Sequence, residues 1–215
     1  MRKVIIGIVA ALVVVVAVII GTSSTAPTSN VDVIHEASAD TGGIGEKTVG
    51  DVNSAELVLY EYADFGCSHC AEWNKEINKL IEKYAGRLAL VFRTYNLGYA
   101  NGPMAAQAVT AAQLQGYFKE YKDIIFTNQV DWFYEEDEDK LIQLFREYFE
   151  KVAPSGDAEK FVQDIKSDAV MRRVAYERQL GEKVHITGTP LFRIDGKKVE
   201  LGDLIKTIEQ RLGEK

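Results

Sequence analysis

The chain has 215 residues, a formal net charge of −7 and two cysteines. This length is enough for one domain with a complete apolar core, so the fold does not need disulfides or a metal for its stability. The acidic balance argues against nucleic acid as a partner, because surfaces that bind nucleic acid are basic.

The N-terminus combines two basic residues with a long apolar run. Val4 to Ile20 comprises 17 residues without a polar or charged side chain. As a helix of about 25 Å, this run reaches the lower limit for crossing a bilayer. We therefore predict an uncleaved transmembrane anchor at residues 1–21, with a cleaved signal peptide as the alternative. Arg2 and Lys3 are expected to remain in the cytoplasm, which places the rest of the chain on the extracytoplasmic side.

The segment after the anchor differs in composition from both of its neighbours. Residues 22–45 are rich in Ser, Thr, Ala and Gly and contain few apolar side chains. This composition favours a flexible linker over a packed core. We therefore place the folded domain at residues 46–215.

The first part of this domain predicts a strand, a helix and a second strand. Leu57 to Tyr62 and Leu88 to Phe92 are short apolar runs, which are typical of buried strands. Between them, the segment from Ala71 to Tyr84 carries apolar side chains at helical spacing. Such an order predicts a right-handed βαβ unit with parallel strands.

Both cysteines lie in the segment Cys67-Ser68-His69-Cys70, between the first strand and this helix. Two thiols separated by two residues can close a small disulfide ring, and the thiolate is the reactive species in disulfide exchange. At the start of a helix, free backbone N–H groups and the helix dipole favour an anion, and His69 adds a second cationic donor. A CxxC in this position is typical of a thioredoxin-like redox site.

Two other roles of the cysteine pair are alternatives to this one. A zinc site on Cys67, Cys70 and His69 would need a fourth ligand, and the only other histidines are His35 and His185. A purely structural disulfide across so few residues would remove little chain entropy, so it would add little stability. We therefore expect a redox-active pair that uses neither a metal nor a cofactor.

The remainder of the domain predicts helices, then a hairpin and a final helix. Helices are expected over about residues 101–182, and the last of these is a single long helix from Asp157 to about Gly181. The hairpin turns at Asp195-Gly196. The order β-α-β, helical block, β-β-α predicts an α/β fold of the thioredoxin type, with a mixed sheet and a helical insertion.

Two segments resemble DsbA-like thiol–disulfide oxidoreductases. The stretch from Gly50 to Cys70 is similar to the opening of these enzymes, and Gly188-Thr189-Pro190 is similar to their cis-proline loop. The helical block between the second strand and this loop matches their insertion in size and position. The resemblance covers residues 46 to about 213, and membrane-anchored bacterial members of the family fit best.

The resemblance implies roles for the residues of the CxxC motif. Cys67 would be the exposed nucleophile that forms a mixed disulfide with the substrate, and Cys70 would be the buried resolving thiol. His69 would stabilise the Cys67 thiolate, and the alternative is a surface histidine without a role. Ser68 departs from the family, because its oxidases usually carry proline after the first cysteine.

The resemblance also implies roles for three residues outside the motif. Thr189, before a cis-Pro190, would present backbone groups to a substrate strand. Glu61, in the middle of the first strand, would be the buried acid that assists proton transfer to or from Cys70. The alternative for Glu61 is a side chain that faces outward from a half-exposed strand.

The function implied by the resemblance is that of an extracytoplasmic, membrane-anchored enzyme. It would oxidise reduced exported proteins by disulfide exchange, and a membrane partner that passes electrons to quinone would reoxidise it. Because of Ser68, a disulfide reductase or isomerase is an alternative. A further alternative is a non-catalytic thioredoxin-fold module that binds exported polypeptides.

Overall fold

The structure is a computed structural model that describes residues 31–213. The anchor expected at residues 1–21 and the first part of the expected linker lie outside the described residues. Within residues 31–213, no helix combines the length and the apolar character needed to cross a membrane.

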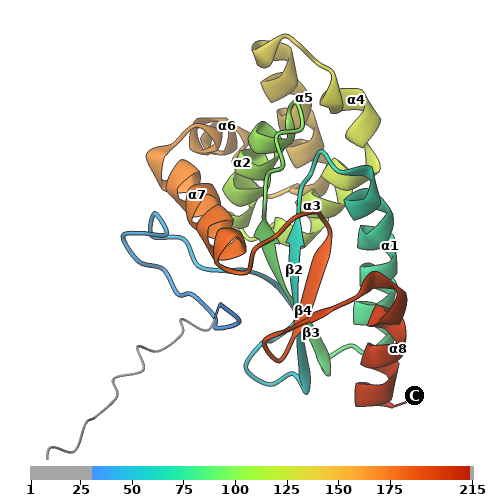
Figure 1. The fold of residues 1–215 in the computed structure, drawn as a ribbon. Helices are drawn as coiled ribbons and strands as arrows, with labels where there is room; N and C mark the ends of the chain where they lie inside the picture. Colours follow the sequence, from blue (N-terminus) through green and yellow to red (C-terminus); the bar gives the residue numbers. More distant parts are fainter. Residues whose placement is uncertain (1–30, 214–215) are drawn as a thin grey trace, which may run out of the picture.

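A five-stranded mixed sheet with the strand order β1-β3-β2-β4-β5 forms the centre of the domain (Figure 1). β2 (Leu57–Ala63) and β3 (Leu88–Thr94) pair in parallel, and β4 (Leu191–Ile194) pairs antiparallel with β2. The edges are β1 (Lys47–Val49), antiparallel to β3, and β5 (Lys197–Val199), antiparallel to β4. Every residue of β3 is buried, which explains why its sequence is an almost unbroken apolar run.

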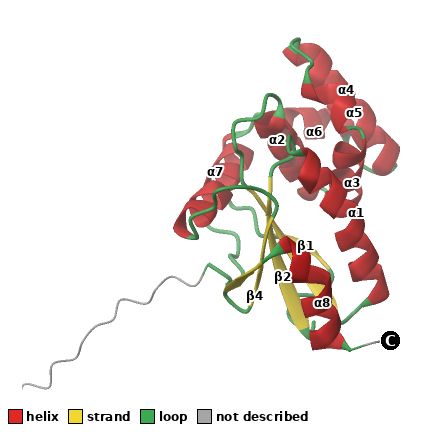
Figure 2. Cartoon of the chain, turned by 45° about the vertical axis from the view of Figure 1, so that its right-hand side comes forward, coloured by secondary structure: helices red, strands yellow, loops and turns green. Residues whose placement is uncertain are grey.

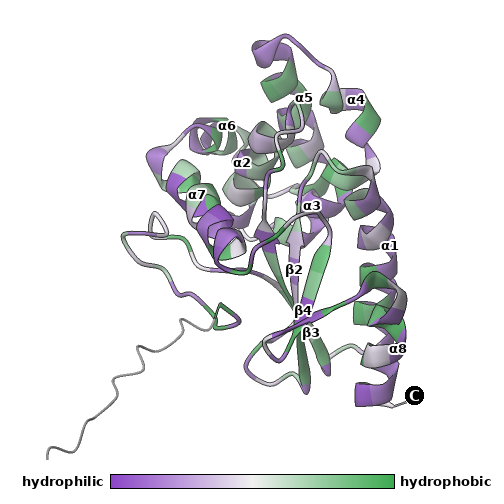
Figure 3. Ribbon diagram, in the orientation of Figure 1, coloured by the Kyte–Doolittle hydropathy of each residue, from purple (hydrophilic) through white to green (hydrophobic). Residues whose placement is uncertain are grey.

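Helices cover both faces of this sheet. α1 (Ser68–Lys83), α3 (Phe118–Thr127) and α8 (Leu201–Leu212) pack on one face, and α7 (Asp168–Lys183) packs on the other (Figures 1 and 2). The strands and the inward sides of these helices are apolar, whereas the outer helix surfaces are hydrophilic (Figure 3). This arrangement confirms the α/β thioredoxin-like fold.

The helical insertion lies between β3 and β4, as expected, and runs from α2 (Gly102–Gln113) to α7. Its other members are α3, α4 (Gln129–Phe133), α5 (Glu138–Val152) and α6 (Ala158–Ile165). The upper part of the molecule in Figure 1 is formed by α2, α4, α5 and α6, near the end of β2 from which α1 starts. The insertion therefore stands next to the CxxC motif.

One helix boundary differs from the expectation. The long helix expected from Asp157 to about Gly181 is two helices, because α6 ends at Ile165 and α7 begins at Asp168. Ser167 is the N-cap of α7, and its hydroxyl accepts the N–H of Val170 at 3.3 Å. This side-chain cap competes with helix continuation, which apolar spacing alone does not reveal.

Several residues in the described part of the expected linker contact the folded domain. Val31 is buried, and Arg93 donates hydrogen bonds to the backbone carbonyl oxygens of Val31 and Val33. Asp32 pairs with Arg193 at 2.9 Å. Residues 31–33 therefore contact the domain, in contrast to the flexible linker expected at residues 22–45. Composition did not reveal this packing because backbone carbonyls and single charged side chains make much of the contact.

A network of buried charges holds this N-terminal segment against β3 and α7. Glu46 accepts hydrogen bonds from Arg93 at 2.7 Å and from Arg173 at 2.5 Å. Glu177 pairs with Lys47 and, at 2.8 Å, with Arg173. All five side chains expose 1% of their surface or less. Buried charges are destabilising unless they are paired. Displacement of the segment would separate these pairs, so the network favours its observed position.

Candidate active site

Cys67 is the N-cap residue of α1, at the junction that follows β2. Its backbone is extended, with φ −85° and ψ 121°, so its side chain can lie against the first free N–H groups of the helix. The backbone N–H groups of His69 and Cys70 interact with the Cys67 sulfur. The junction therefore supplies a site for a thiolate, as the sequence predicted.

Thr189 and Pro190 lie beside Cys67, although 122 residues separate Cys67 from Thr189. The Thr189–Pro190 peptide bond is cis, as the resemblance implied. The Cys67 thiol donates a hydrogen bond to the carbonyl oxygen of Thr189, with 3.4 Å between sulfur and oxygen. Cys67 exposes only 6% of its surface, which is less than the exposed nucleophile that was expected. The contact with the Thr189 carbonyl oxygen contributes to this burial.

The surroundings of Cys67 favour its ionised form and lower the pKa of its thiol to about 5. The largest contribution is a hydrogen bond from the Cys70 thiol, and burial opposes it. Thr189 and the backbone N–H groups of Cys70 and His69 also favour the thiolate. The Thr189 hydroxyl oxygen is buried and has no hydrogen-bond partner among the described residues, so this hydroxyl is available to the thiolate. The surroundings therefore favour a thiolate at Cys67.

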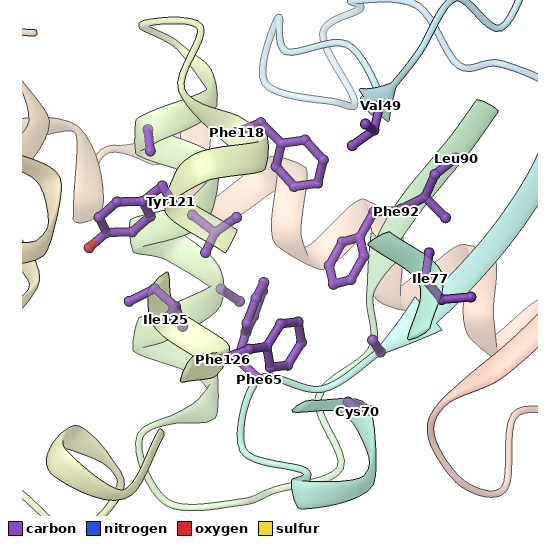
Figure 4. Close-up of a cluster of buried hydrophobic side chains, with 14 of the residues drawn as sticks. Val49, Phe65, Cys70, Ile77, Leu90, Phe92, Phe118, Tyr121, Ile125 and Phe126 are labelled. Carbon is purple, nitrogen blue, oxygen red and sulfur yellow. The ribbon is translucent and has the colours of Figure 1, made fainter. Parts of the chain in front are cut away.

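Cys70 lies one turn into α1 and is completely buried. Its side chain belongs to the main apolar core, which also contains Phe65, Phe92 and Phe126 (Figure 4). Burial, and then the hydrogen bond with Cys67, raise the pKa of the Cys70 thiol far above its ordinary value. The two thiols therefore differ sharply in acidity, and both are in the free, reduced form.

His69 lies at the surface, on the second residue of α1. Within residues 31–213, its imidazole makes no hydrogen bond or ion pair, and its contact with Cys67 is through the backbone N–H. A role of the imidazole in stabilising the thiolate stays a prediction. The alternative, a surface histidine without a role, is equally compatible with this geometry.

Glu61 is buried in the middle of β2, on the face that α1 and α3 cover. Its register partners are Phe92 on β3 and Phe192 on β4, and both of these are core residues. Neither carboxylate oxygen has a hydrogen-bond partner within the described chain. Burial raises the pKa of Glu61 to about 7, and the charge of Lys122 opposes this rise. The alternative of an outward-facing side chain is therefore wrong.

Three polar residues near Glu61 were not singled out from the sequence. Lys122 on α3 is fully buried, donates a hydrogen bond to Asn74 on α1 and pairs with Asp123 at 3.0 Å. Asn74 donates to Asp123 at 3.0 Å, and the Asp123 side chain is 26% exposed. Asn74 could have been found, because it lies one turn after Cys70 on the same face of α1. Lys122 carries no such signal, since it comes from a distant helix.

No metal site is formed by the described residues. Between residues 31 and 213, no group of three or more His, Cys, Asp or Glu side chains is arranged to hold an ion. His69 is exposed, whereas Cys70 is buried beneath it.

A comparison with known families identifies the family to which this chain belongs. The sequence profile described as thioredoxin matches residues 44–210, which is most of the chain. The chain belongs to the thioredoxin family. This match includes β2, the CxxC motif, the helical insertion and the loop of Thr189 and Pro190.

Individual relatives and solved structures extend this result. The Na(+)/H(+) antiporter NhaA of Herminiimonas arsenicoxydans is 33% identical over 147 residues, which are 67% of this chain and 22% of that protein. The chain thus spans about a fifth to a quarter of the length of the antiporters that it matches. The "Probable disulfide bond formation protein D" of Bacillus cereus is 25% identical over 171 residues, covering 74% of this chain and 76% of that protein.

Two solved structures show the same fold. Oxidised BdbD from Bacillus subtilis aligns with a TM-score of 0.67 at 17% identity, covering 84% of this chain and 97% of that one. Wolbachia pipientis alpha-DsbA1 aligns with a TM-score of 0.63 at 25% identity, covering 78% of this chain and 91% of that one. The resemblance to DsbA-like thiol–disulfide oxidoreductases, which the motifs indicated, is therefore confirmed.

Proposed function

We propose that this protein is a thiol–disulfide oxidoreductase that oxidises reduced exported proteins. The observation that carries the proposal is the asymmetry between the two cysteines. Cys67 has a pKa of about 5 and lies beside the Thr189 loop, whereas Cys70 is completely buried and has a strongly raised pKa. In the oxidised pair, a substrate thiolate can attack the Cys67 sulfur. Cys70 is then released as a thiol that stays protonated.

The proposed reaction begins with the Cys67–Cys70 disulfide. A substrate thiolate attacks the Cys67 sulfur, the bond between the two cysteines breaks, and its electron pair goes to the Cys70 sulfur, which takes up a proton. A second substrate thiolate then attacks the substrate sulfur of the mixed disulfide. Cys67 leaves as a thiolate, and the substrate has lost two electrons and two protons. The low pKa of Cys67 makes it a good leaving group in this step.

Glu61 is proposed to supply and later remove the proton at Cys70. Its pKa of about 7 allows both protonation states near neutral pH. Both residues face the same core region between the sheet and α1. Thr189 is proposed to hold the substrate backbone beside Cys67 during exchange, because its loop already contacts the sulfur.

The direction of electron flow is part of the proposal. A stabilised thiolate stabilises the reduced protein, and this makes the disulfide form a stronger oxidant. The name of the Bacillus cereus relative, "Probable disulfide bond formation protein D", agrees with oxidation. We further propose an extracytoplasmic location, with attachment to the membrane through residues 1–21 and reoxidation by a quinone-linked membrane partner.

The decisive experiment has two measurements. Cys70→Ser is expected to trap reductant-sensitive adducts with exported proteins, because Cys67 still attacks while the resolving thiol is missing. Cys67→Ser is the matched control and should trap none. The equilibrium of the native pair with glutathione then gives the reduction potential. A reduction potential near that of thioredoxin would show that the protein is a reductase and not an oxidase. If neither adducts nor thiol exchange are observed, the protein is a non-catalytic binding module.

A further inference from the structure

Asp64 is the first residue after β2, at the point where the chain turns toward the CxxC motif. The residue is completely buried, and no lysine or arginine of residues 31–213 compensates its charge. A carboxylate that is buried without a cation is destabilising unless hydrogen bonds replace its water. The proposed reaction gives Asp64 no role, so its hydrogen-bond partners are the guide to what it does.

Each oxygen of this carboxylate accepts one backbone N–H. Oδ1 accepts from Gly66 at 2.9 Å, which closes a tight turn directly before Cys67. Oδ2 accepts from Leu97 at 2.5 Å, in the loop between β3 and α2. Burial raises the pKa of Asp64, and these two N–H groups oppose the rise. The carboxylate therefore ties the turn before the motif to the loop that leads into the helical insertion.

The backbone of Asp64 contacts both cysteines. Its carbonyl oxygen accepts the N–H of Cys67 at 3.1 Å, and this bond fixes the direction in which Cys67 enters α1. Its own N–H lies at the sulfur of Cys70, where it favours the thiolate. In the proposed reaction, this sulfur receives the electron pair when the disulfide breaks. The peptide groups on both sides of the Asp64 side chain thus belong to the active site.

The start of α2 approaches the carboxylate so closely that only glycine fits. A Cβ atom at Gly102, the first residue of α2, would lie 2.7 Å from Oδ1 of Asp64 and 3.4 Å from the backbone nitrogen of Gly66. The first of these distances is shorter than Cβ atoms make in folded proteins. The dipole of α2 also favours a negative charge at this end. The turn, the loop and α2 therefore fix the position of the carboxylate from three sides.

We propose that the carboxylate of Asp64 is a positioning group for thiol–disulfide exchange. It holds the turn of residues 64–67, so that the Cys67 sulfur stays at the free N–H groups of α1 and the Asp64 N–H stays at the Cys70 sulfur. The inference rests on the proposed function and deepens it. The carboxylate acts through the backbone that it holds, and it stabilises the reduced form of the pair.

The charge of the carboxylate and its hydrogen bonds act in opposite directions on Cys67. A negative charge close to a thiolate would by itself raise the Cys67 pKa. The hydrogen bonds lower this pKa, because they keep the N–H groups of His69 and Cys70 at the Cys67 sulfur. When the carboxylate is replaced, the direction of the change in the Cys67 pKa therefore shows which of the two effects is larger.

The test is Asp64→Asn in the full chain. Asn has nearly the same size, but it offers one acceptor oxygen and an NH₂ group, which faces an N–H donor in place of the second oxygen. We expect the Cys67 pKa to rise by about one unit, a tenfold weaker ionisation. The reduction potential should fall with it, by about 30 mV for this tenfold change. Alkylation rates against pH give the pKa, and the glutathione equilibrium gives the potential.

A second variant, Gly102→Ala, displaces the carboxylate without removing its charge. It should raise the Cys67 pKa and lower the potential, as Asp64→Asn does. Both changes act on the same contact, so the shifts should not add in the double variant. The double variant is therefore expected to show the shift of Asp64→Asn alone.

Each variant has a matched control. Asp51→Asn changes an exposed acid before β2 that also accepts an N–H two residues further on, from Asn53 at 2.9 Å. Gly202→Ala changes a glycine near the start of α8, where an added Cβ would have no neighbour within 4 Å. Both controls should keep the Cys67 pKa and the reduction potential of the parent.

Three results would overturn the positioning role. A fall in the Cys67 pKa of Asp64→Asn would show that the carboxylate acts through its charge. An unchanged pKa and potential, together with lower stability, would show that Asp64 is only structural. Shifts that add fully in the double variant would show that Gly102 and Asp64 act separately. If Asp64→Asn does not fold, Gly102→Ala decides alone, and an unchanged Cys67 pKa in this variant overturns the role.

The measurements also distinguish the positioning role from the proposed function. If the unchanged protein exchanges thiols with glutathione and Asp64→Asn behaves like the parent, the positioning role is wrong and the oxidoreductase stands. If the unchanged protein does not exchange with glutathione, the proposed function fails. The alkylation rates, which do not depend on exchange, then still show whether Asp64 holds Cys67 in its thiolate-stabilising position.

Discussion

The sulfur of Cys67 lies 3.4 Å from the backbone carbonyl oxygen of Thr189, so one hydrogen bond joins the start of α1 to the loop before β4. This bond exists only while Cys67 carries its proton, because a carbonyl oxygen cannot donate. The Cys70 thiol and the N–H groups of α1 act in the opposite direction and favour the thiolate. The loss of the Cys67 proton therefore frees the Thr189 carbonyl for another donor, such as a substrate N–H.

The first prediction concerns the acidity of Cys67. Alkylation of the reduced protein should follow thiolate formation with a midpoint near pH 5, against an ordinary value of 9.0. Cys70→Ala should raise the Cys67 pKa, because it removes the largest stabilising hydrogen bond. Cys70→Ser retains a donor and should raise it less. Rates of alkylation against pH give both values, and equal midpoints in the two variants would contradict this assignment.

The second prediction distinguishes the effect of the His69 imidazole from that of the His69 backbone N–H. The imidazole is exposed, whereas the backbone N–H contacts the Cys67 sulfur. His69→Ala keeps the N–H, and His69→Pro removes it at a position in the first helical turn where proline is tolerated. We expect His69→Pro to raise the Cys67 pKa more than His69→Ala does. Each unit of this rise should lower the reduction potential by about 30 mV.

The control for this comparison is Ser68→Ala, a neighbouring change that removes neither the His69 N–H nor its imidazole. Ultraviolet absorbance of the thiolate against pH and the glutathione equilibrium are measured on all variants. A larger shift in His69→Ala than in His69→Pro would show that the imidazole, and not the backbone, stabilises the thiolate.

The core of the site was predictable because its parts are local in sequence. A buried strand, two cysteines and an amphipathic helix follow one another within 27 residues, from Leu57 to Lys83, and local patterning reports such units well. Thr189 and Pro190 were placed only through the family resemblance, since no local pattern connects them with Cys67. The burial of Glu61 was predictable, because a carboxylate inside an apolar strand is unusual.

Features that depend on contacts between distant parts of the chain could not be predicted from the sequence. Lys122 is buried by helices that lie far from β2 in sequence, and a lysine is ordinarily a surface residue. β1 has only 3 residues, and one of them is the buried Lys47, so neither its length nor its composition indicated a strand. The packed segment before β1 was missed for the same reason, because its partners are charges on β3 and α7.

The third prediction uses the buried acid. The folded state raises the pKa of Glu61 from 4.5 to about 7, so the folded protein holds this proton more tightly than the unfolded chain. Stability should therefore fall as the pH rises from about 4.5 to about 7 and then level off for this group. Glu61→Gln removes the ionisation and should stabilise the protein at pH 8 by about 3 kcal/mol, from 1.36 kcal/mol per pKa unit. Below pH 4.5 the two proteins should be alike.

Denaturant unfolding at several pH values measures this difference, with Glu72→Gln as the control, since Glu72 is an exposed carboxylate on α1. Lys122→Met should raise the Glu61 pKa further, because Lys122 is the group that lowers it. Lys119→Met is the matched control for this change, since Lys119 also pairs with Asp123 but is partly exposed. A pH-independent effect of Glu61→Gln would contradict the raised pKa, because it would mean that Glu61 has the same pKa in the folded and the unfolded protein.

The fourth prediction concerns the buried charges that hold the N-terminal segment. Arg173 pairs with Glu46 and Glu177 and donates to the carbonyl oxygen of Ile44. Arg173→Met leaves two buried carboxylates with fewer partners, which should destabilise the protein by about 3–5 kcal/mol. Arg172→Met, a change of the exposed neighbour, should stay within about 0.5 kcal/mol of the parent.

A second measurement tests which part of the chain Arg173→Met destabilises. Cleavage after Glu36 by a glutamate-specific protease should become faster in Arg173→Met, because the segment of residues 31–46 loses its attachment to α7 before the whole domain unfolds. Arg172→Met should be cleaved as slowly as the parent. If both variants unfold and are cleaved alike, the charge network does not fasten the segment. Its position would then depend on the burial of Val31 and on the hydrogen bonds from Arg93.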